Sequence, residues 1–161
     1  MLLETMIAMG IVAVFLTGQY SANLRVWSLL RASLESNAAS RVLNGRTEQI
    51  RAATWDQITN AAFLNTSVLS VAPDAAGDLG ALNETIDVIA YPTPSPNPTA
   101  LRVTRNNDTG TVSTVGAGDG TMNAQTSLRI NLTETWTAKG GQPRMKQLSV
   151  IVSNGGVIGR H

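Results

Sequence analysis

Charged residues are absent from a long stretch near the start of the chain. None occurs between Glu4 and Arg25, and residues 6–16 are apolar apart from one glycine. Together with the milder residues 17–24, the stretch approaches the about 20 residues that cross a bilayer as a helix. A run that is apolar on all sides is typical of a membrane span or of an equally buried helix. The pattern therefore predicts that residues 1–24 are buried in a membrane or in an assembly.

A secretory signal peptide is an alternative explanation of this apolar stretch. Such a peptide needs a basic region before it and a small-residue cleavage site after it. The chain begins instead with Met1-Leu2-Leu3-Glu4, which places an acid where basic residues belong. Membrane burial, or equivalent burial in protein, is therefore the preferred interpretation.

After residue 24 the apolar residues continue at helical spacing. They recur at Trp27, Leu30, Leu34, Ala38 and Val42, and the stripe is widened by Leu29, Leu43 and Ile50. The charged residues fall largely outside this stripe, where we expect solvent or a neighbouring subunit to meet them: Arg25, Arg31, Glu35, Arg41, Arg46, Glu48 and Arg51. Residues 2 to about 54 thus predict one helix of roughly 75–80 Å. Its amphipathic half, residues 25–58, is expected to pack on the protein's own domain, with Trp27 in the core and Trp55 packing at the hinge.

From residue 59 onward the pattern changes to that of strands and turns. Six segments are rich in Val, Ile, Leu and Thr and are bounded by turn-forming residues: 63–71, 84–91, 100–105, 110–115, 127–138 and 145–153. The last two predict an antiparallel hairpin, with Trp136 in the sheet core or at its edge. The expected loops are residues 74–82, 91–99 and 115–125, the second of them proline-rich and extended.

The predicted fold class is therefore α+β. A long N-terminal helix, apolar in its first half and amphipathic in its second, packs on a small antiparallel sheet that forms the head domain at residues 59–161.

Composition removes most classes of enzyme. Charged residues make up 14% of the chain, against roughly 25% in an average soluble domain. The net charge of +1 provides no field for binding phosphate backbones. There is no cysteine, and the single histidine is His161, so neither thiol chemistry nor a Ser-His-Asp triad can be built within one chain. We expect no catalytic residue, no cofactor and no specific nucleic-acid partner.

The first eleven residues carry a more specific signal. The segment Leu2-Leu3-Glu4-Thr5-Met6-Ile7-Ala8-Met9-Gly10-Ile11 resembles the start of a mature type IV pilin or of a related type II secretion pseudopilin. In that family a leucine pair, one glutamate and a run of apolar residues follow the peptidase cut. The order of a long helix, a connecting loop and a small sheet is similar as well. The resemblance implies that filament assembly uses Leu2, Leu3, Glu4, Met6, Ile7, Ile11, Val14 and Phe15, with Met1 at the processing and methylation position.

The chain departs from the family pattern in several places. The basic leader ending in glycine and the usual first phenylalanine are missing, so Glu4 lies one position early if Met1 is the mature terminus. Either one residue precedes Met1 or the chain is a variant with methionine near the processing site. The family's cysteines and its helix-breaking proline are missing too. Because Thr17-Gly18 replaces the proline, Gly10 and Gly18 are the candidates for local helix melting.

The single acid of the apolar stretch needs a physical explanation. An ionised carboxylate in hydrocarbon costs several kcal/mol unless it is paired. The resemblance implies that Glu4 meets the N-terminal amine of an adjacent subunit and so sets the axial register of a filament. Alternatively Glu4 stabilises the start of its own helix, where a negative charge contributes about 0.3–1 kcal/mol. The two roles are compatible.

The resemblance implies a structural subunit of an extracellular, pilus-like filament at the cell surface. The subunit is expected to form a helical homo-oligomer after a pool in the inner membrane. A prepilin peptidase and separate motor and platform proteins are the implied partners, because the chain has no GxxxxGK[ST] phosphate-binding loop. A pseudopilin of a secretion system, a membrane-tethered binding module that does not polymerise, and an enzyme are the alternatives. The sequence does not distinguish motility, adhesion, DNA uptake and secretion, or a major from a minor subunit.

Other acidic residues are weaker candidates for chemistry. Asp108 and Asp119 lie in Asx- and Gly-rich segments that could offer oxygen ligands to calcium, but the spacing is that of turns. Four further acids are expected to be solvated loop residues rather than a hydrolytic pair: Asp74, Asp78, Glu84 and Asp87.

Overall fold

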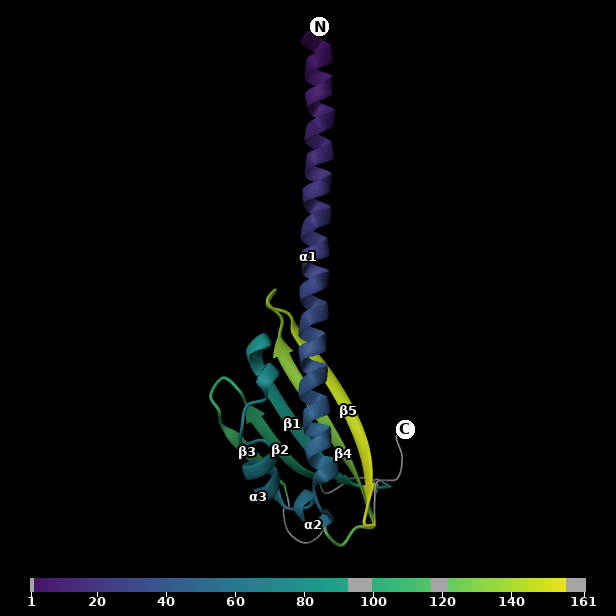
Figure 1. Cartoon of the computed structure of the whole chain (residues 1–161), viewed down its shortest axis with the longest axis vertical. Helices are drawn as coiled ribbons and strands as arrows, with labels where there is room; N and C mark the ends of the chain where they lie inside the picture. Colours follow the sequence, from purple (N-terminus) through teal and green to yellow (C-terminus); the bar gives the residue numbers. More distant parts are fainter. Residues whose placement is uncertain (1, 93–99, 117–121, 156–161) are drawn as a thin grey trace. The chain divides into compact units, whose positions relative to one another are not determined.

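A computed structural model describes residues 2–92, 100–116 and 122–155 of the 161-residue chain. One long helix, α1 (Leu2–Ala52), is followed by the short helices α2 (Trp55–Ile58) and α3 (Ala61–Phe63), the π-helical turn η1 (Leu64–Val68) and the 3-10 turn η2 (Asp74–Asp78). Five strands complete the fold: β1 (Gly80–Ala90), β2 (Ala100–Asn106), β3 (Val112–Val115), β4 (Ser127–Thr137) and β5 (Pro143–Ser153) (Figure 1). The predicted α+β class is confirmed.

The chain forms two compact units that divide within α1. The first ends at Ser36 and consists of helix alone, whereas the second begins at Asn37 and contains the last part of α1 and the whole sheet. The helix ends at Ala52, close to the predicted residue 54. The next helix, α2, begins directly afterwards. Its N-terminus is capped by a capping box, in which the Gln57 side chain accepts a hydrogen bond from the Thr54 amide at 2.9 Å.

All neighbouring strands of the sheet are antiparallel, in the order β3-β2-β1-β4-β5. The predicted hairpin is confirmed as β4 and β5, which stay in register from Ser127 opposite Ser153 to Thr137 opposite Pro143. Its turn is closed by hydrogen bonds from the Ala138 amide to Gln142 and from the Gly141 amide to Ala138. Gly141 has a φ of +78°, a conformation that glycine adopts without strain.

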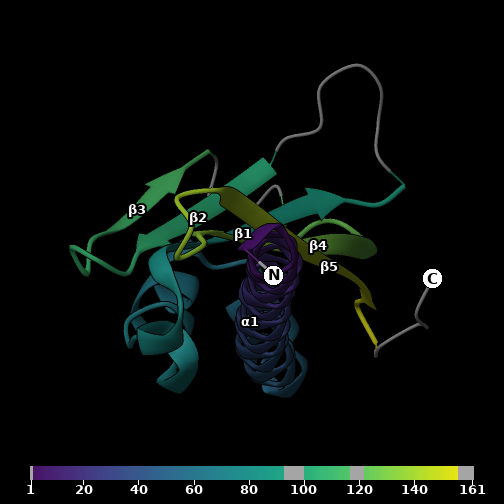
Figure 2. The ribbon, with the colours of Figure 1, turned by 90° about the horizontal axis from the view of Figure 1, so that it is seen from above.

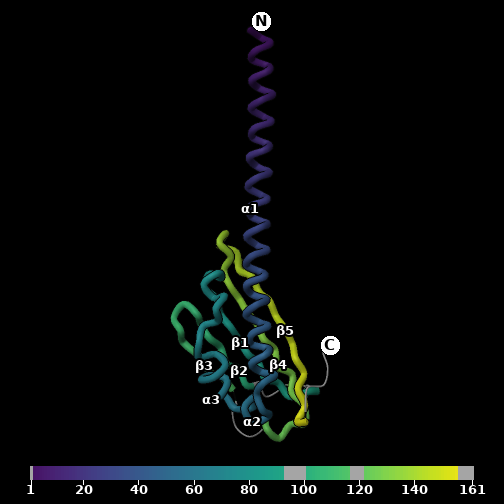
Figure 3. The backbone as a smooth tube through the Cα atoms, viewed as in Figure 1, coloured from purple at the N-terminus to yellow at the C-terminus, as the bar shows by residue number. Residues whose placement is uncertain are grey.

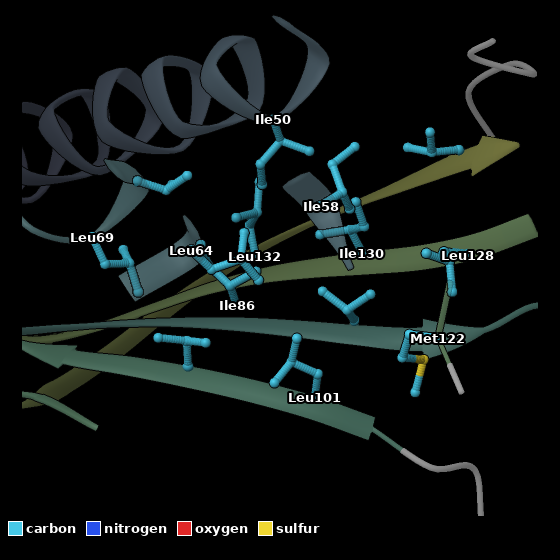
Figure 4. Packing of buried hydrophobic residues seen from close by; sticks show 14 of the residues in the cluster. Ile50, Ile58, Leu64, Leu69, Ile86, Leu101, Met122, Leu128, Ile130 and Leu132 are labelled. Carbon is cyan, nitrogen blue, oxygen red and sulfur yellow. The ribbon is translucent and has the colours of Figure 1, made fainter. Parts of the chain in front are cut away.

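One face of the sheet supplies the hydrophobic core. Along β1 from Leu82 onward and along β4, the even-numbered residues are buried and the odd-numbered ones are half-buried or exposed. The helical segments after α1 lie on the same face of the sheet as the part of α1 beyond Asn37 (Figure 2). Ile50 of α1 and Ile58 of α2 lie over Ile130 and Leu132 of β4 (Figure 4). Each fully buried aliphatic side chain of this kind contributes about 1.5–3 kcal/mol.

The predicted strand at residues 63–71 is wrong, because residues 63–68 are helical and residues 69–71 form a bend (Figure 3). Local hydrogen bonds outweigh the β propensity of its side chains. The Asn60 side chain accepts a bond from the Ala62 amide at 2.9 Å, and Thr66 Oγ1 donates to the Ala62 carbonyl at 2.8 Å. Leu64 and Val68, four residues apart, are then buried together against the sheet.

The predicted apolar stripe of the helix is buried only in its second part. Ala38 and Val42 are 1% and 3% exposed, whereas Trp27 is 61% exposed, as Leu29, Leu30 and Leu34 also are to 51–70%. The assignment of Trp27 to the core is therefore wrong. Helical periodicity shows that one face is apolar, but it does not say where along the helix the sheet begins to cover that face.

The two other tryptophans follow their predictions. Trp136 is 5% exposed within the core of β4, an interior strand. Trp55 is half-buried against the core, and its Nε1 donates to the Asn123 carbonyl at 3.0 Å.

The expected loops fare differently. Residues 74–82 contain the turn η2 and the start of β1, so the expectation of a plain loop there is wrong. Residues 93–99 of the proline-rich segment and residues 117–121 of the loop at 115–125 lie outside the described residues.

Candidate functional site

The apolar half of α1 presents its side chains outward along its whole length. The predicted assembly residues Leu2, Leu3, Met6, Ile7, Ile11, Val14 and Phe15 are each 56–80% exposed. A contiguous apolar surface of this size marks an interaction site, because soluble proteins rarely leave one in water. By length and composition, α1 is also able to cross a membrane.

The threonine and serine hydroxyl groups of this segment are satisfied inside the helix. Thr5 Oγ1 donates to the Leu2 carbonyl at 2.9 Å, Thr17 Oγ1 to Ala13 at 2.7 Å, and Ser21 Oγ to Thr17 at 2.9 Å. A hydroxyl group without a hydrogen-bond partner would cost several kcal/mol in hydrocarbon, so these bonds allow the segment to be buried in lipid or protein. Thr5, Thr17 and Ser21 therefore add no unsatisfied hydroxyl group to the apolar surface.

Glu4 is the exception on this surface. It is exposed, and among the described residues it has no hydrogen-bond or ion-pair partner. The predicted processing position, Met1, lies outside the described residues. A partner for the Glu4 carboxylate must therefore come from solvent, from the chain terminus or from another molecule.

The two candidate melting positions lie in unbroken helix. α1 runs continuously through Gly10 and Gly18, and open space surrounds both. Any melting at these glycines would accompany assembly rather than exist in the isolated chain.

A buried charged cluster lies in the second unit, where the sequence predicted solvated residues. The Arg46 and Glu84 side chains are 6% and 3% exposed and form an ion pair with bonds of 2.7 and 3.1 Å. Arg46 also donates to Gln49 Oε1 at 3.1 Å, to the Val71 carbonyl at 2.8 Å, and to the Val68 carbonyl. All five N–H groups of this guanidinium are thus occupied, and they tie α1 to β1 and to the end of η1.

A second guanidinium extends the cluster from β2. Arg105 donates to the Leu69 and Ser70 carbonyls, both at 2.8 Å, and to Asn107 Oδ1 at 2.8 Å. Asn107 in turn donates to Glu84 Oε2 at 2.9 Å. The two arginines together satisfy the carbonyl groups that η1 leaves open at its end.

Glu134 completes the cluster without a hydrogen bond. It lies opposite Glu84 on β1 and opposite Lys146 on β5, is 2% exposed, and neither of its carboxyl oxygens has a partner among the described residues. Lys146 Nζ donates to Ser40 Oγ at 2.5 Å. Burial and the neighbouring Glu84 charge raise the pKa of Glu134 from 4.5 to about 8, against the opposing charges of Arg46 and Lys146. Glu134 is therefore protonated in the folded protein at neutral pH.

The Glu84–Glu134 pair is no hydrolytic site. The cavity beside it holds only about 10 Å³, enough for one water molecule and too small for a substrate. The other predicted solvated acids behave differently: Asp78 forms an exposed pair with Arg41 at 3.1 Å, and Asp87 a bidentate pair with Arg102 at 2.6 and 3.0 Å.

The candidate ion ligands do not form a site. The Asn106 side chain accepts bonds from the Asp108 and Thr109 amides at 2.9 and 3.1 Å, which makes the predicted Asx turn. Asp119 lies outside the described residues, and the described part of the chain contains no cluster of acidic or histidine side chains that fits a metal ion.

Sequence reasoning missed the charged cluster although a signal was present. Arg46 lies midway between Val42 and Ile50 on the buried stripe of α1, each four residues away. Glu84 and Glu134 occupy positions of β1 and β4 whose side chains face the core. Charged residues at core-facing positions predict buried ion pairs, but the partners are far apart in sequence and only the fold brings them together.

A pocket of about 400 Å³ opens beside this cluster, between residues 41–49 of α1 and residues 71–75. Its lining mixes the apolar Val42, Val71 and Pro73 with Arg41 and Asp74.

Comparison with protein-family models, with curated proteins and with solved structures gives no match. The likeness to pilins therefore rests on the order of the elements: a long apolar N-terminal helix whose last part packs on a five-stranded antiparallel sheet.

Proposed function

We propose that this protein is a structural subunit of a type IV pilus-like extracellular filament that polymerises through the apolar half of α1. One observation carries the proposal: a 23-residue segment without a cation exposes large apolar side chains on all sides, while its threonine and serine hydroxyls are satisfied internally. The sheet unit has its own core, to which no residue of this segment belongs. The segment is therefore free to be covered by other molecules.

The energetics favour transfer between two apolar environments. In the membrane the segment lies in lipid, and in a filament the same surface packs against the helices of other subunits, so apolar burial is exchanged rather than lost. Head-to-tail stacking of identical subunits gives open helical symmetry and needs no self-complementary patch. Extraction from the membrane requires work, for which separate motor and platform proteins are the source.

We assign to Glu4 the role of setting the axial register between subunits of the filament. Its carboxylate lacks a partner among the described residues and would be costly in an apolar core if it stayed unpaired. Pairing with the N-terminal amine of an adjacent subunit removes that cost at one axial offset only. We predict that Glu4→Ala blocks filament formation while membrane insertion persists, whereas Glu48→Ala, at an exposed acid of the same helix, leaves both unchanged.

Electron microscopy of surface filaments, with immunoblots of washed membranes, measures the two effects. Normal filaments in Glu4→Ala would show that register does not depend on this carboxylate.

Mass spectrometry of the N-terminal peptide tests the proposed function itself. The peptide is compared between sheared surface filaments and washed membranes from the same cells. We expect a cut, methylated terminus that is enriched in the filaments. An uncut terminus that occurs only in membranes would refute the filament and leave a tethered domain.

The pocket beside α1 favours that second candidate, a membrane-tethered binding module. Its volume of about 400 Å³ lies within the range of small-molecule sites. A module of this kind remains monomeric at the cell surface, so the same filament preparation separates the two functions.

A further inference from the structure

The end of the apolar segment carries aromatic and basic side chains that the assembly surface does not explain. Tyr20 and Trp27 are 66% and 61% exposed, and Arg25 and Arg31 are exposed as well. No acid occurs between Glu4 and Glu35, so this part of the helix is purely cationic. Tyrosine and tryptophan are enriched at membrane–water interfaces, where their rings lie among the lipid headgroups.

The positions of these side chains match the depth of a bilayer interface. Residues 2–24 extend about 34 Å as a helix, slightly more than the about 30 Å of the hydrocarbon layer. Arg25 therefore follows directly where the hydrocarbon ends, and Arg31 lies about 9 Å further along the axis. Trp27 and Arg31 follow Tyr20 at seven and eleven residues, which places all three on one face of the helix, and Arg25 points to another.

The positive charges of Arg25 and Arg31 are not paired with carboxylates in the described part of the chain. Neither Arg25 nor Arg31 forms an ion pair among the described residues. By contrast, four arginines further along the described chain pair with carboxylates: Arg41, Arg46, Arg51 and Arg102. The Arg25 carbonyl accepts a hydrogen bond from Ser28 Oγ at 2.8 Å, whereas the Arg25 guanidinium has no side-chain partner among the described residues.

We propose that Tyr20, Arg25, Trp27 and Arg31 form an interfacial collar that binds the phosphate headgroups of anionic phospholipids while the subunit waits in the membrane. The inference rests on the membrane stage of the proposed function. The guanidinium groups bind phosphate through paired N–H donors, and the aromatic rings fix their depth. The collar holds the helix against sliding along its axis until it is withdrawn into a filament.

The size of the effect follows from the surface electrostatics of membranes. A basic residue near an anionic surface contributes a preference of about 5-fold, so the two arginines together give up to about 30-fold. The preference falls with added salt, because the charges lie in the hydrated headgroup layer.

Fluorescence quenching of Trp27 by brominated lipids tests the collar in the full-length chain. The protein is reconstituted into vesicles that contain brominated phosphatidylglycerol or brominated phosphatidylcholine, and the Trp27→Phe variant provides the background from the two other tryptophans. We expect brominated phosphatidylglycerol to quench Trp27 more strongly than brominated phosphatidylcholine. The preference for phosphatidylglycerol should fall about 5-fold in Arg25→Gln or Arg31→Gln, and the double variant should lose it entirely. The double variant Lys139→Gln/Arg144→Gln removes the same charge from exposed positions of the head and should retain the preference.

The outcomes separate the collar from the function on which it rests. Equal quenching of the wild type by both lipids, or a preference that survives Arg25→Gln/Arg31→Gln, overturns the collar and leaves the membrane stage standing. An absence of quenching by either lipid shows that the helix does not enter the bilayer, and both proposals then fail.

Discussion

Glu134 makes the stability of the sheet unit depend on pH in an unusual direction. Its pKa is 4.5 in an unfolded chain and about 8 in the folded protein, because burial disfavours the carboxylate and Glu84 repels it, while Arg46 and Lys146 oppose the shift. Between these two pH values the folded state holds a proton that the unfolded state has lost. The Glu134 contribution to the free energy of unfolding therefore falls as pH rises through this window, by about 1.4 kcal/mol per pH unit.

Glu134→Gln isolates this contribution, because glutamine imitates the protonated acid and does not titrate. Below pH 4.5 the wild type is protonated in both states, so the stability difference between the two proteins is constant there. From pH 4.5 towards pH 8 the stability of the variant rises progressively relative to that of the wild type, and the change in the difference reaches up to about 5 kcal/mol. Above pH 8 the carboxyl group is ionised in both states and the difference stays constant again.

Urea unfolding of the full-length chain in a non-ionic detergent measures this difference. Fluorescence reports the transition, since Trp136 is buried in the same sheet. Glu48→Gln is the matched control, because it makes the same substitution at a side chain that is 71% exposed. If the difference between wild type and Glu134→Gln is the same at pH 5 and pH 9, Glu134 does not hold a proton in the folded protein.

Two further substitutions test the packing of the second unit by the same unfolding assay. Gly80→Ala should destabilise by about 1–3 kcal/mol, because a Cβ there would lie 2.8 Å from the Thr137 carbonyl oxygen. Gly45→Ala, in open space within α1, should instead stabilise by up to about 1 kcal/mol, and equal effects at the two sites would refute the close approach. Arg46→Met should destabilise by about 3–5 kcal/mol, because it leaves Glu84 buried without its cation. Replacement of both partners, Arg46→Met with Glu84→Leu, should recover much of that loss, and a double variant as unstable as the single one would show that the pair itself is not the cause.

Periodicity in the sequence was sufficient where it was long and uniform. The helix α1 and the hairpin of β4 and β5 follow from repeats of three to four and of two residues over many positions. Periodicity did not predict the structure of residues 63–71, because a short apolar segment fits a strand and a buried helical turn equally well. The Asn60 cap and the Thr66 bond decided that segment, and they are visible only once the backbone path is known.

The exposed apolar surface of residues 2–24 was predictable and the charged cluster was not. Residues 2–24 are recognisable because an apolar run needs no partner to be identified, and they are exposed in the isolated chain. The cluster depends on pairs such as Arg46 with Glu84 and Arg105 with Leu69, which are separated by 38 and 36 residues. Sequence gives the charges of such residues but not their distances.

The sequence by itself thus determined the α+β class and the apolar helix, because these depend on composition and local repeats. Only the tertiary structure decided that Trp27 is exposed, that Arg46 and Glu84 are buried, and that Glu134 carries a proton. The physical reason is that burial and charge pairing depend on distances between segments far apart in the chain, and these distances are set when the sheet closes on residues 37–52 of α1.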